Sequence, residues 1–256
     1  SRKVVLTEEG MILRRRAEEI ISLMRRTEEE ITGSDEIIAG NVFIGAGETE
    51  TVRLFAQAAQ KIQKKYPDIQ YHISSGNAEH VLDYLDKGLI DFGLLFTKVD
   101  PQKYEALPMP VKDTWGVLMR KDSPLAKKES ICPEDLWDKP LIISHQKGDD
   151  ILLDHWLRRE KSELHIVATY NLLFNASLLV DEGLGYALGL DNIINTQSGS
   201  LCFRPLSPRL EVNSFIVWKK YQVFSKAANL FLRYLQDMIP LIEPLDPNIQ
   251  GSGSSR

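Results

Sequence analysis

The residue types that carry out catalysis do not fall into any catalytic spacing in this 256-residue chain. The sequence contains no G-x-x-x-x-G-K-[ST] phosphate loop, no H-E-x-x-H zinc motif, no G-x-S-x-G nucleophile motif and no C-x-x-C pair. The five histidines are scattered, and no two of them share the spacing of metal ligands on a helix. The sequence therefore predicts no enzyme, no metal site and no cofactor.

Two weaker candidates for chemistry also have simpler explanations. Cys132 and Cys202 are the only cysteines and have no activating neighbour in the sequence, so we expect buried or half-buried thiols in a reducing compartment. Gly45-Ala46-Gly47 follows a predicted strand and precedes a helix, as in dinucleotide sites, but Glu50 stands where the third glycine is needed. Nucleotide binding is therefore not expected.

Polar residues gather instead at the turns between predicted strands and helices. In open α/β sheets, ligands bind beyond the carboxyl ends of the strands, where helix N-termini present unpaired N–H groups. Such turns from two lobes predict one shared ligand cleft. The alternative is that Thr49, Asn77 and Asn171 only cap helices. The predicted ligand-binding residues are Gly47, Thr49, Ser75, Asn77, Thr97, Ser144, His145, Tyr170 and Asn171.

Two series of alternating strands and helices must position these turns. The first comprises strand 41–45, helix 50–65, strand 69–74, helix 77–87 and strand 91–95. The second comprises strand 141–144, helix 149–161, strand 164–168, helix 172–182, strand 185–189 and helix 191–197. Extended pieces follow the first series at 104–111 and 114–120, and the second at 201–206 and 211–219, before a helix at 224–239. Two crossings between two lobes predict an α/β fold with a hinge.

A long helix is predicted to precede the two lobes. The pattern is helical from Thr7 until Gly33 ends it, a length of ~37 Å at 1.5 Å per residue. A narrow apolar seam on such a polar helix favours pairing with a second helix, and packing on its own domain is the alternative. The seam residues, spaced in heptad style, are Leu13, Ala17, Ile20, Met24 and Ile31.

Composition narrows the function further. A hydrophobic content of 43% excludes a disordered chain, and a net charge of -5 lacks the basicity of a dedicated nucleic-acid binder. No apolar run approaches the ~18 residues of a membrane span, so we expect a cytoplasmic protein. Residues 3–6 look like the end of a strand, which suggests that a segment upstream has been removed.

Several motifs together resemble the LysR-type transcriptional regulators. Val5-Leu6-Thr7-Glu8-Glu9-Gly10, the long helix and Gly40-x-Val42-x-Ile44-Gly45-Ala46 match the junction of DNA-binding domain, linker helix and effector-binding domain. The resemblance covers residues 5–240. The further matching pieces are Tyr66-Pro67, Gly76-Asn77, Gly88-Leu89-Ile90-Asp91-Phe92-Gly93, Ser123-Pro124-Leu125 and Gly183-Leu184-Gly185-Tyr186-Ala187.

The resemblance implies two Rossmann-like lobes joined by two crossover strands, as in type II periplasmic binding proteins, after a linker helix. A small-molecule effector binds between the lobes, with Thr49, Gly76-Asn77 and Thr97 at the family's contact positions. The implied domains are a winged helix-turn-helix remnant (1–7), a linker and dimerisation helix (8–33), lobe I (40–112 plus 209–243), lobe II (113–208) and a tail (244–256).

The same resemblance implies the partners. The chain forms a homodimer or homotetramer, contacts operator DNA only through a missing N-terminal domain, and does not bind membranes. The alternative is a transporter's solute-binding protein, which has the same fold but no use for a heptad helix.

Two departures from the family pattern matter. Leu188-Gly189-Leu190 stands where the family commonly has a proline. Glu48 and Glu50 flank Thr49 where neutral residues are commoner, which argues against a simple carboxylate effector because added negative charge would repel it.

Overall fold

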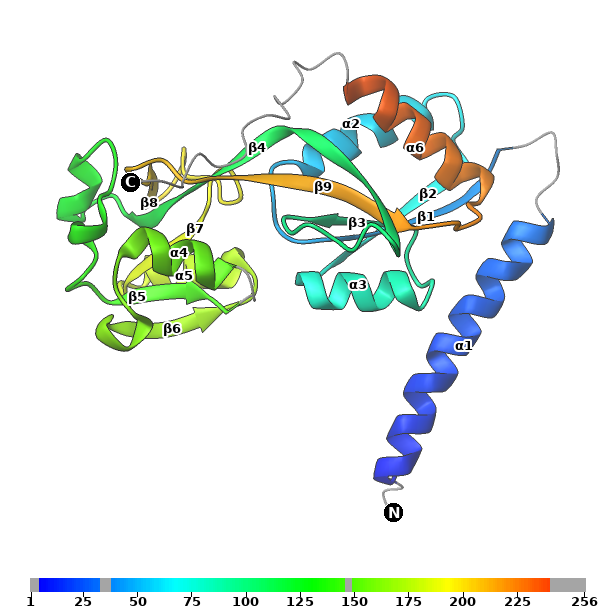
Figure 1. The fold of residues 1–256 in the computed structure, drawn as a ribbon, viewed down its shortest axis with the longest axis horizontal. Helices are drawn as coiled ribbons and strands as arrows, with labels where there is room; N and C mark the ends of the chain where they lie inside the picture. The colour runs from blue at the N-terminus through cyan, green and yellow to red at the C-terminus, as the bar shows by residue number, and fades with distance from the viewer. Residues whose placement is uncertain (1–4, 33–37, 146–148, 240–256) are drawn as a thin grey trace.

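The computed structural model describes residues 5–32, 38–145 and 149–239. Figure 1 shows a long helix, α1 (Glu8–Thr32), beside two α/β lobes that two strands connect. The predicted fold class is confirmed. The tail 244–256, residues 1–4 of the predicted helix-turn-helix remnant, and Gly33 lie outside the described residues.

Lobe I is a sheet covered by helices on both faces (Figure 1). Its central strands are buried on both sides, as parallel strands between helix layers are, and all four residues of β3 are buried. The sheet order is β2-β1-β3-β9-β4, with parallel pairing among the first three strands and antiparallel pairing after β3. Its elements are β1 (Gly40–Ala46), α2 (Val52–Gln63), β2 (Ile69–Ser75), α3 (Ala78–Asp86), β3 (Phe92–Leu95), β4 (Tyr104–Arg120), β9 (Glu211–Lys219) and α6 (Lys226–Met238).

Two apolar cores hold lobe I together. The larger lies between the sheet and helices α2 and α6, where Phe55, Phe92 and Phe231 are almost completely buried. The smaller lies under α3, around Val81 and Leu85. Helix α3 is thereby fixed to the sheet face opposite α2 and α6.

Lobe II repeats the scheme with its own cores. Strands β7, β5 and β6 are parallel, and the far half of β4 pairs antiparallel with β7 and β8. Its elements are the 3₁₀ turns Pro124–Lys127, Pro133–Asp135 and Lys161–Glu163, together with β5 (Leu141–Ser144), α4 (Asp149–Leu157), β6 (Ile166–Tyr170), α5 (Leu173–Asp181), β7 (Tyr186–Leu190) and β8 (Leu201–Pro205).

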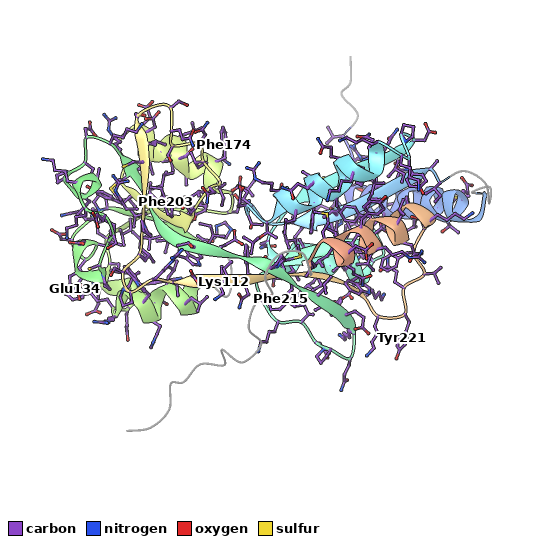
Figure 2. The ribbon with its side chains drawn as sticks, turned by 90° about the horizontal axis from the view of Figure 1, so that it is seen from above. Lys112, Glu134, Phe174, Phe203, Phe215 and Tyr221 are labelled. Carbon is purple, nitrogen blue, oxygen red and sulfur yellow. The ribbon has the colours of Figure 1, made fainter. Side chains whose placement is uncertain are left out.

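The lobes are joined by β4 and the β9 segment. The predicted pieces 104–111 and 114–120 form one strand, β4, whose pairing with β9 shifts register between Pro108 and Lys112. Prolines lack the N–H that a ladder needs, so the pairing is irregular there while the strand continues. Figure 2 shows Lys112 on the crossing strands. Its Nζ lies 3.4 Å from Glu211 Oε2.

Two predicted helices differ in the structure. The predicted helix 191–197 is wrong: this segment is turns and bends, because Asp191 and Asn195 side chains accept hydrogen bonds from nearby backbone N–H groups and Asn192 has a φ of 61°. The predicted helix 149–161 ends at Leu157, since Arg158 has a φ of 56°.

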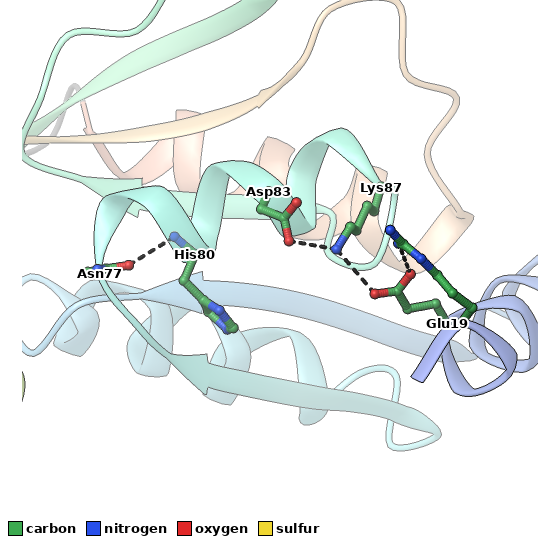
Figure 3. Close-up of polar contacts among 6 residues, drawn as sticks. Glu19, Asn77, His80, Asp83 and Lys87 are labelled. Atoms are coloured by element: carbon green, nitrogen blue, oxygen red, sulfur yellow. Dashed lines mark hydrogen bonds and ion pairs between the residues drawn. The ribbon is translucent and has the colours of Figure 1, made fainter. Parts of the chain in front are cut away.

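Helix α1 rests on the C-terminal end of α3. Its start is capped by Thr7, because Thr7 Oγ1 accepts a hydrogen bond from the Gly10 N–H at 3.1 Å. Lys87 Nζ lies 3.1 Å from Glu19 Oε1 and 2.8 Å from Asp83 Oδ2, so one ammonium group links α1 to α3. Figure 3 shows both contacts as dashed lines. Asp83 and, to a smaller extent, Glu19 raise the pKa of Lys87 by accepting these hydrogen bonds.

The predicted seam of α1 is largely uncovered within the chain. Leu13, Ile20 and Met24 are 70%, 63% and 62% exposed, whereas Ala17 is half-buried. The side chain of Ile31 lies outside the described residues. The seam is therefore available to a partner, and its pairing stays a prediction.

Candidate functional site

A cleft opens between the two lobes, where the carboxyl ends of their parallel strands meet. Its volume is about 60 Å³. Lobe I contributes the turns after β1, β2 and β3, and lobe II contributes the ends of β5, β6 and β7 and the start of α5. The connecting strands β4 and β9 contribute Trp115 and Val212. The apolar lining residues are Ala78, Leu94, Leu95, Phe96, Trp115, Leu173, Leu190, Ile193 and Val212.

Five of the predicted effector-binding residues line this cleft: Gly47, Thr97, Ser144, Tyr170 and Asn171. They come from four different turns of the two lobes, which the tertiary fold brings together. The Tyr170 hydroxyl already donates a hydrogen bond to the Leu188 carbonyl at 2.6 Å, so the ring is fixed in orientation. Their contact with an effector stays a prediction.

Thr49 lies behind the cleft and hydrogen-bonds to a buried carboxylate. Its Oγ1 donates to Asp113 Oδ1 at 2.6 Å and accepts from the Thr51 N–H at 3.0 Å. Thr51 Oγ1 donates to Asp113 Oδ2 at 3.2 Å, and Ser214 Oγ donates to Thr51 Oγ1 at 3.1 Å. This network, Thr49-Thr51-Asp113-Ser214, ties the turn after β1 to both crossing strands.

Asp113 is only 4% exposed, and this burial shifts the pKa of its carboxyl group. Desolvation raises its pKa above the ordinary value of 3.8, because the charged form loses its water. The hydrogen bonds from Thr49, Thr51 and the Glu50 N–H act in the opposite direction. The effect of burial is the larger, so the neutral form is favoured relative to a solvated carboxyl.

The remaining predicted residues do not line the cleft in this structure. Asn77 caps α3, where its Oδ1 accepts a hydrogen bond from the His80 N–H at 2.9 Å (Figure 3). Ser75 ends β2 with an exposed side chain, and His145 is exposed while its N–H donates to the Tyr170 carbonyl at 3.0 Å. For Asn77 the capping alternative therefore accounts for the residue.

Glu48 lines the cleft, and its side chain reaches from lobe I to lobe II. One of its carboxylate oxygens, Oε2, accepts a hydrogen bond from the Leu173 N–H at the start of α5. This bond joins a turn of lobe I to a helix N-terminus of lobe II. Glu50, in the same turn, instead forms an ion pair with Arg53 on α2 and does not line the cleft.

The described residues contain no group of three or more His, Cys, Asp or Glu side chains that could hold a metal ion. Cys132 is half-buried and Cys202 is buried, and desolvation raises the pKa of the Cys202 thiol. Within the described residues, no helix has both the length and the apolar character needed to cross a membrane.

The sequence profile of the LysR substrate binding domain matches residues 36–240. The chain belongs to this LysR family. It is 25% identical over 186 residues to the uncharacterized HTH-type transcriptional regulator YvbU of Bacillus subtilis, covering 72% of this chain and 62% of that protein. It is 24% identical to the uncharacterized HTH-type transcriptional regulator YfeR of Shigella flexneri, covering 93% of this chain and 77% of YfeR.

A solved LysR-type structure shares the fold. The effector binding domain of QuiR in complex with shikimate superposes with a TM-score of 0.68 at 19% identity, covering 81% of this chain and 100% of that domain. The two-lobed architecture is therefore that of a LysR effector-binding domain, as the sequence motifs predicted.

Two residues at or beside the cleft were not predicted from the sequence. Trp115 lies on β4 and lines the cleft, but an apolar residue in an extended run is indistinguishable from a core residue. Asp113 also lies on β4, and its acidic type within a largely apolar strand could have marked it in the sequence. A buried carboxylate needs hydrogen-bond partners, so polar residues nearby could have been expected. Glu48 was noticed only for its charge.

Proposed function

We propose that this chain is the effector-sensing region of a LysR-type transcriptional regulator, with a small molecule bound in the cleft between the lobes. The observation that carries the proposal is the cleft itself, which takes polar residues from both lobes and lies beside the strands that connect them. A ligand held by both sets stabilises one relative placement of the lobes through its differential affinity. QuiR, which holds shikimate in the same fold, supports this use of the fold.

We propose that the long helix α1 pairs with α1 of a second copy to form a homodimer or homotetramer. The support is the exposed apolar seam, because exposed apolar stripes mark interaction surfaces. We further propose that operator DNA is bound by a helix-turn-helix domain of the whole protein, as the names of the HTH-type relatives suggest.

The relatives also bear on the alternatives. Both are named transcriptional regulators, which favours a regulator over a transporter's solute-binding protein. For the same reason we propose a cytoplasmic protein without catalytic activity.

A thermal-shift screen of small metabolites, followed by calorimetric titration of a hit, tests the cleft. A ligand present at 100 times its dissociation constant should add ~2.7 kcal/mol to the free energy of unfolding. Thr97→Val keeps the shape of a cleft-lining side chain and removes its hydroxyl, so affinity should fall roughly two- to tenfold.

The matched control is Thr169→Val, at an exposed threonine of β6 that does not line the cleft. If both variants bind the hit as tightly as the wild type, the hydroxyl of Thr97 contributes nothing. If substitutions of the other polar cleft residues also leave the affinity for the hit unchanged, the effector binds elsewhere.

A further inference from the structure

The charge of the cleft indicates the chemical class of its ligand. Among the described residues that line it, Glu48 is the one charged residue, and none is Lys, Arg or His. Resting on the proposed function above, we propose that the cleft takes a compact ligand without negative charge, which donates a hydrogen bond to Glu48 and accepts one from the Trp115 indole N–H.

Glu48 occupies the position that a ligand carboxylate would use. The N-terminus of α5 attracts anions, because its first N–H groups are unpaired and the helix dipole is positive there. The N-cap residue Leu172 has no side chain that could cap the helix, and the Glu48 carboxylate takes that role from the opposite lobe. An anionic ligand would have to displace this carboxylate or bind beside a like charge.

The Glu48 carboxylate can still accept a hydrogen bond from a ligand. An ionised carboxylate offers about four acceptor positions, and the bond from the Leu173 N–H uses one of them. A ligand N–H or O–H group that donates to Glu48 therefore need not break the bond between the lobes. It would add to the same interlobe contact.

Trp115 supplies the second, independent observation. Its residue is 3% exposed and lines the cleft, and its indole Nε1 is buried with no hydrogen-bond partner in the described part of the chain. By contrast, the indole N–H groups of Trp137 and Trp156 donate to backbone carbonyls at 3.0 Å and 2.8 Å. Because an unpaired buried donor is unfavourable, a ligand acceptor at Trp115 would be bound selectively.

The size of the cleft limits the ligand to a few heavy atoms in this conformation. One water molecule needs roughly 10–15 Å³ of space, and the cleft has about 60 Å³. The walls around Trp115, Leu94 and Leu190 are apolar, so a short branched aliphatic group fits their chemistry.

Three probes of the same shape separate the two contacts. Isobutyramide can donate and accept, isobutyramidine only donates and carries positive charge, and isobutyrate only accepts and carries negative charge. We expect isobutyramide to bind the wild type at least about tenfold more tightly than isobutyrate, which corresponds to 1.4 kcal/mol. Binding is followed by the indole ¹H–¹⁵N resonance of Trp115, which the Trp115→Phe variant identifies by its loss.

The resonance also tests the hydrogen bond itself. Isobutyramide should move the Trp115 indole proton downfield, whereas isobutyramidine, which has no acceptor, should not. Glu48→Gln keeps an acceptor for the Leu173 N–H and removes the charge, so isobutyrate should then bind within about threefold of isobutyramide. Glu50→Gln removes a charge from the same turn without touching the cleft, and the wild-type preference should persist.

Two results would overturn the proposal in different ways. If isobutyrate binds the wild type as tightly as isobutyramide and moves the Trp115 resonance, the cleft is still a ligand site but its charge preference is wrong. If none of the three probes moves the Trp115 resonance, the ligand class proposed here is wrong, and the cleft assignment of the proposed function is then decided separately by the metabolite screen and the cleft variants described above.

Discussion

The carboxylates of Glu48 and Asp113 lie in the same region of the molecule but in different surroundings, and we expect them to have different roles. Glu48 lines the cleft and caps a helix of the other lobe. Asp113 lies buried behind the cleft, where hydroxyls of Thr49 and Thr51 donate to its two oxygens. We therefore expect Glu48 to act on ligand selection and Asp113 to act on the stability of the connection between the lobes.

Asp113 should make stability depend on pH. Its folded pKa lies above the ordinary 3.8, so the folded protein binds more protons than the unfolded protein between these two values. The contribution of Asp113 to the free energy of unfolding should therefore fall as pH rises from about 4 through the raised pKa, and stay level above it. Asp113→Asn cannot titrate, so the difference between wild type and variant should fall over the same window.

Urea unfolding of both proteins across pH 4 to 7 measures this difference. Asp68→Asn, at an exposed position, is the control for the loss of one carboxylate elsewhere in the chain. A difference between wild type and Asp113→Asn that grows with pH would contradict the expected direction.

At the scale of elements, α3 connects the cleft to the long helix α1. Gly76 and Ala78, at its N-terminal end, line the cleft. Lys87, just after its C-terminal end, forms ion pairs with Asp83 and with Glu19 of α1 (Figure 3). Nine residues of helix span ~13 Å at 1.5 Å per residue, so the two ends of α3 are held at a fixed separation.

The N-cap of α3 is a testable part of this element. Asn77→Ala removes the acceptor for the His80 N–H and should lower the free energy of unfolding by ~0.5–2 kcal/mol. Asn77→Asp keeps an acceptor at the helix N-terminus and should retain the wild-type stability. Urea midpoints of the three proteins give the comparison, and a loss as large for Asn77→Asp as for Asn77→Ala would remove the capping role.

The whole molecule presents two surfaces for partners: the cleft between the lobes and the seam of α1. The lobes have separate apolar cores, so their relative placement depends on the crossing strands and on contacts across the cleft. The long helix lies beside lobe I (Figure 1) and leaves Leu13, Ile20 and Met24 uncovered. A second copy that covered this seam would bury them.

Association through α1 should respond to charge in the seam. Ile20→Glu places a carboxylate in the middle of the proposed interface, where burial without a partner is unfavourable. We expect a lower sedimentation mass at low micromolar concentration, with both lobes still folded. Met11→Glu is the control, because Met11 is also exposed apolar surface of α1 but lies off the seam. An unchanged mass for Ile20→Glu would remove the seam from the interface.

The sequence by itself determined the elements and their order. Hydrophobic periods and strand-to-helix turns predicted the parallel series in each lobe, the crossings between them and the heptad seam, because these patterns depend on neighbours a few residues apart. The same local logic failed at 191–197, where the Asp191 and Asn195 side chains compete for backbone N–H groups.

Only the tertiary structure decided which polar residues face the cleft. Thr49 and Glu48 are adjacent, yet one turns inward to Asp113 and the other reaches the Leu173 N–H, 125 residues away in the chain. Trp115 differs from a core residue only because the two lobes leave a cleft beside it. Such choices depend on how two separately packed lobes are placed, and no spacing within either lobe encodes that placement.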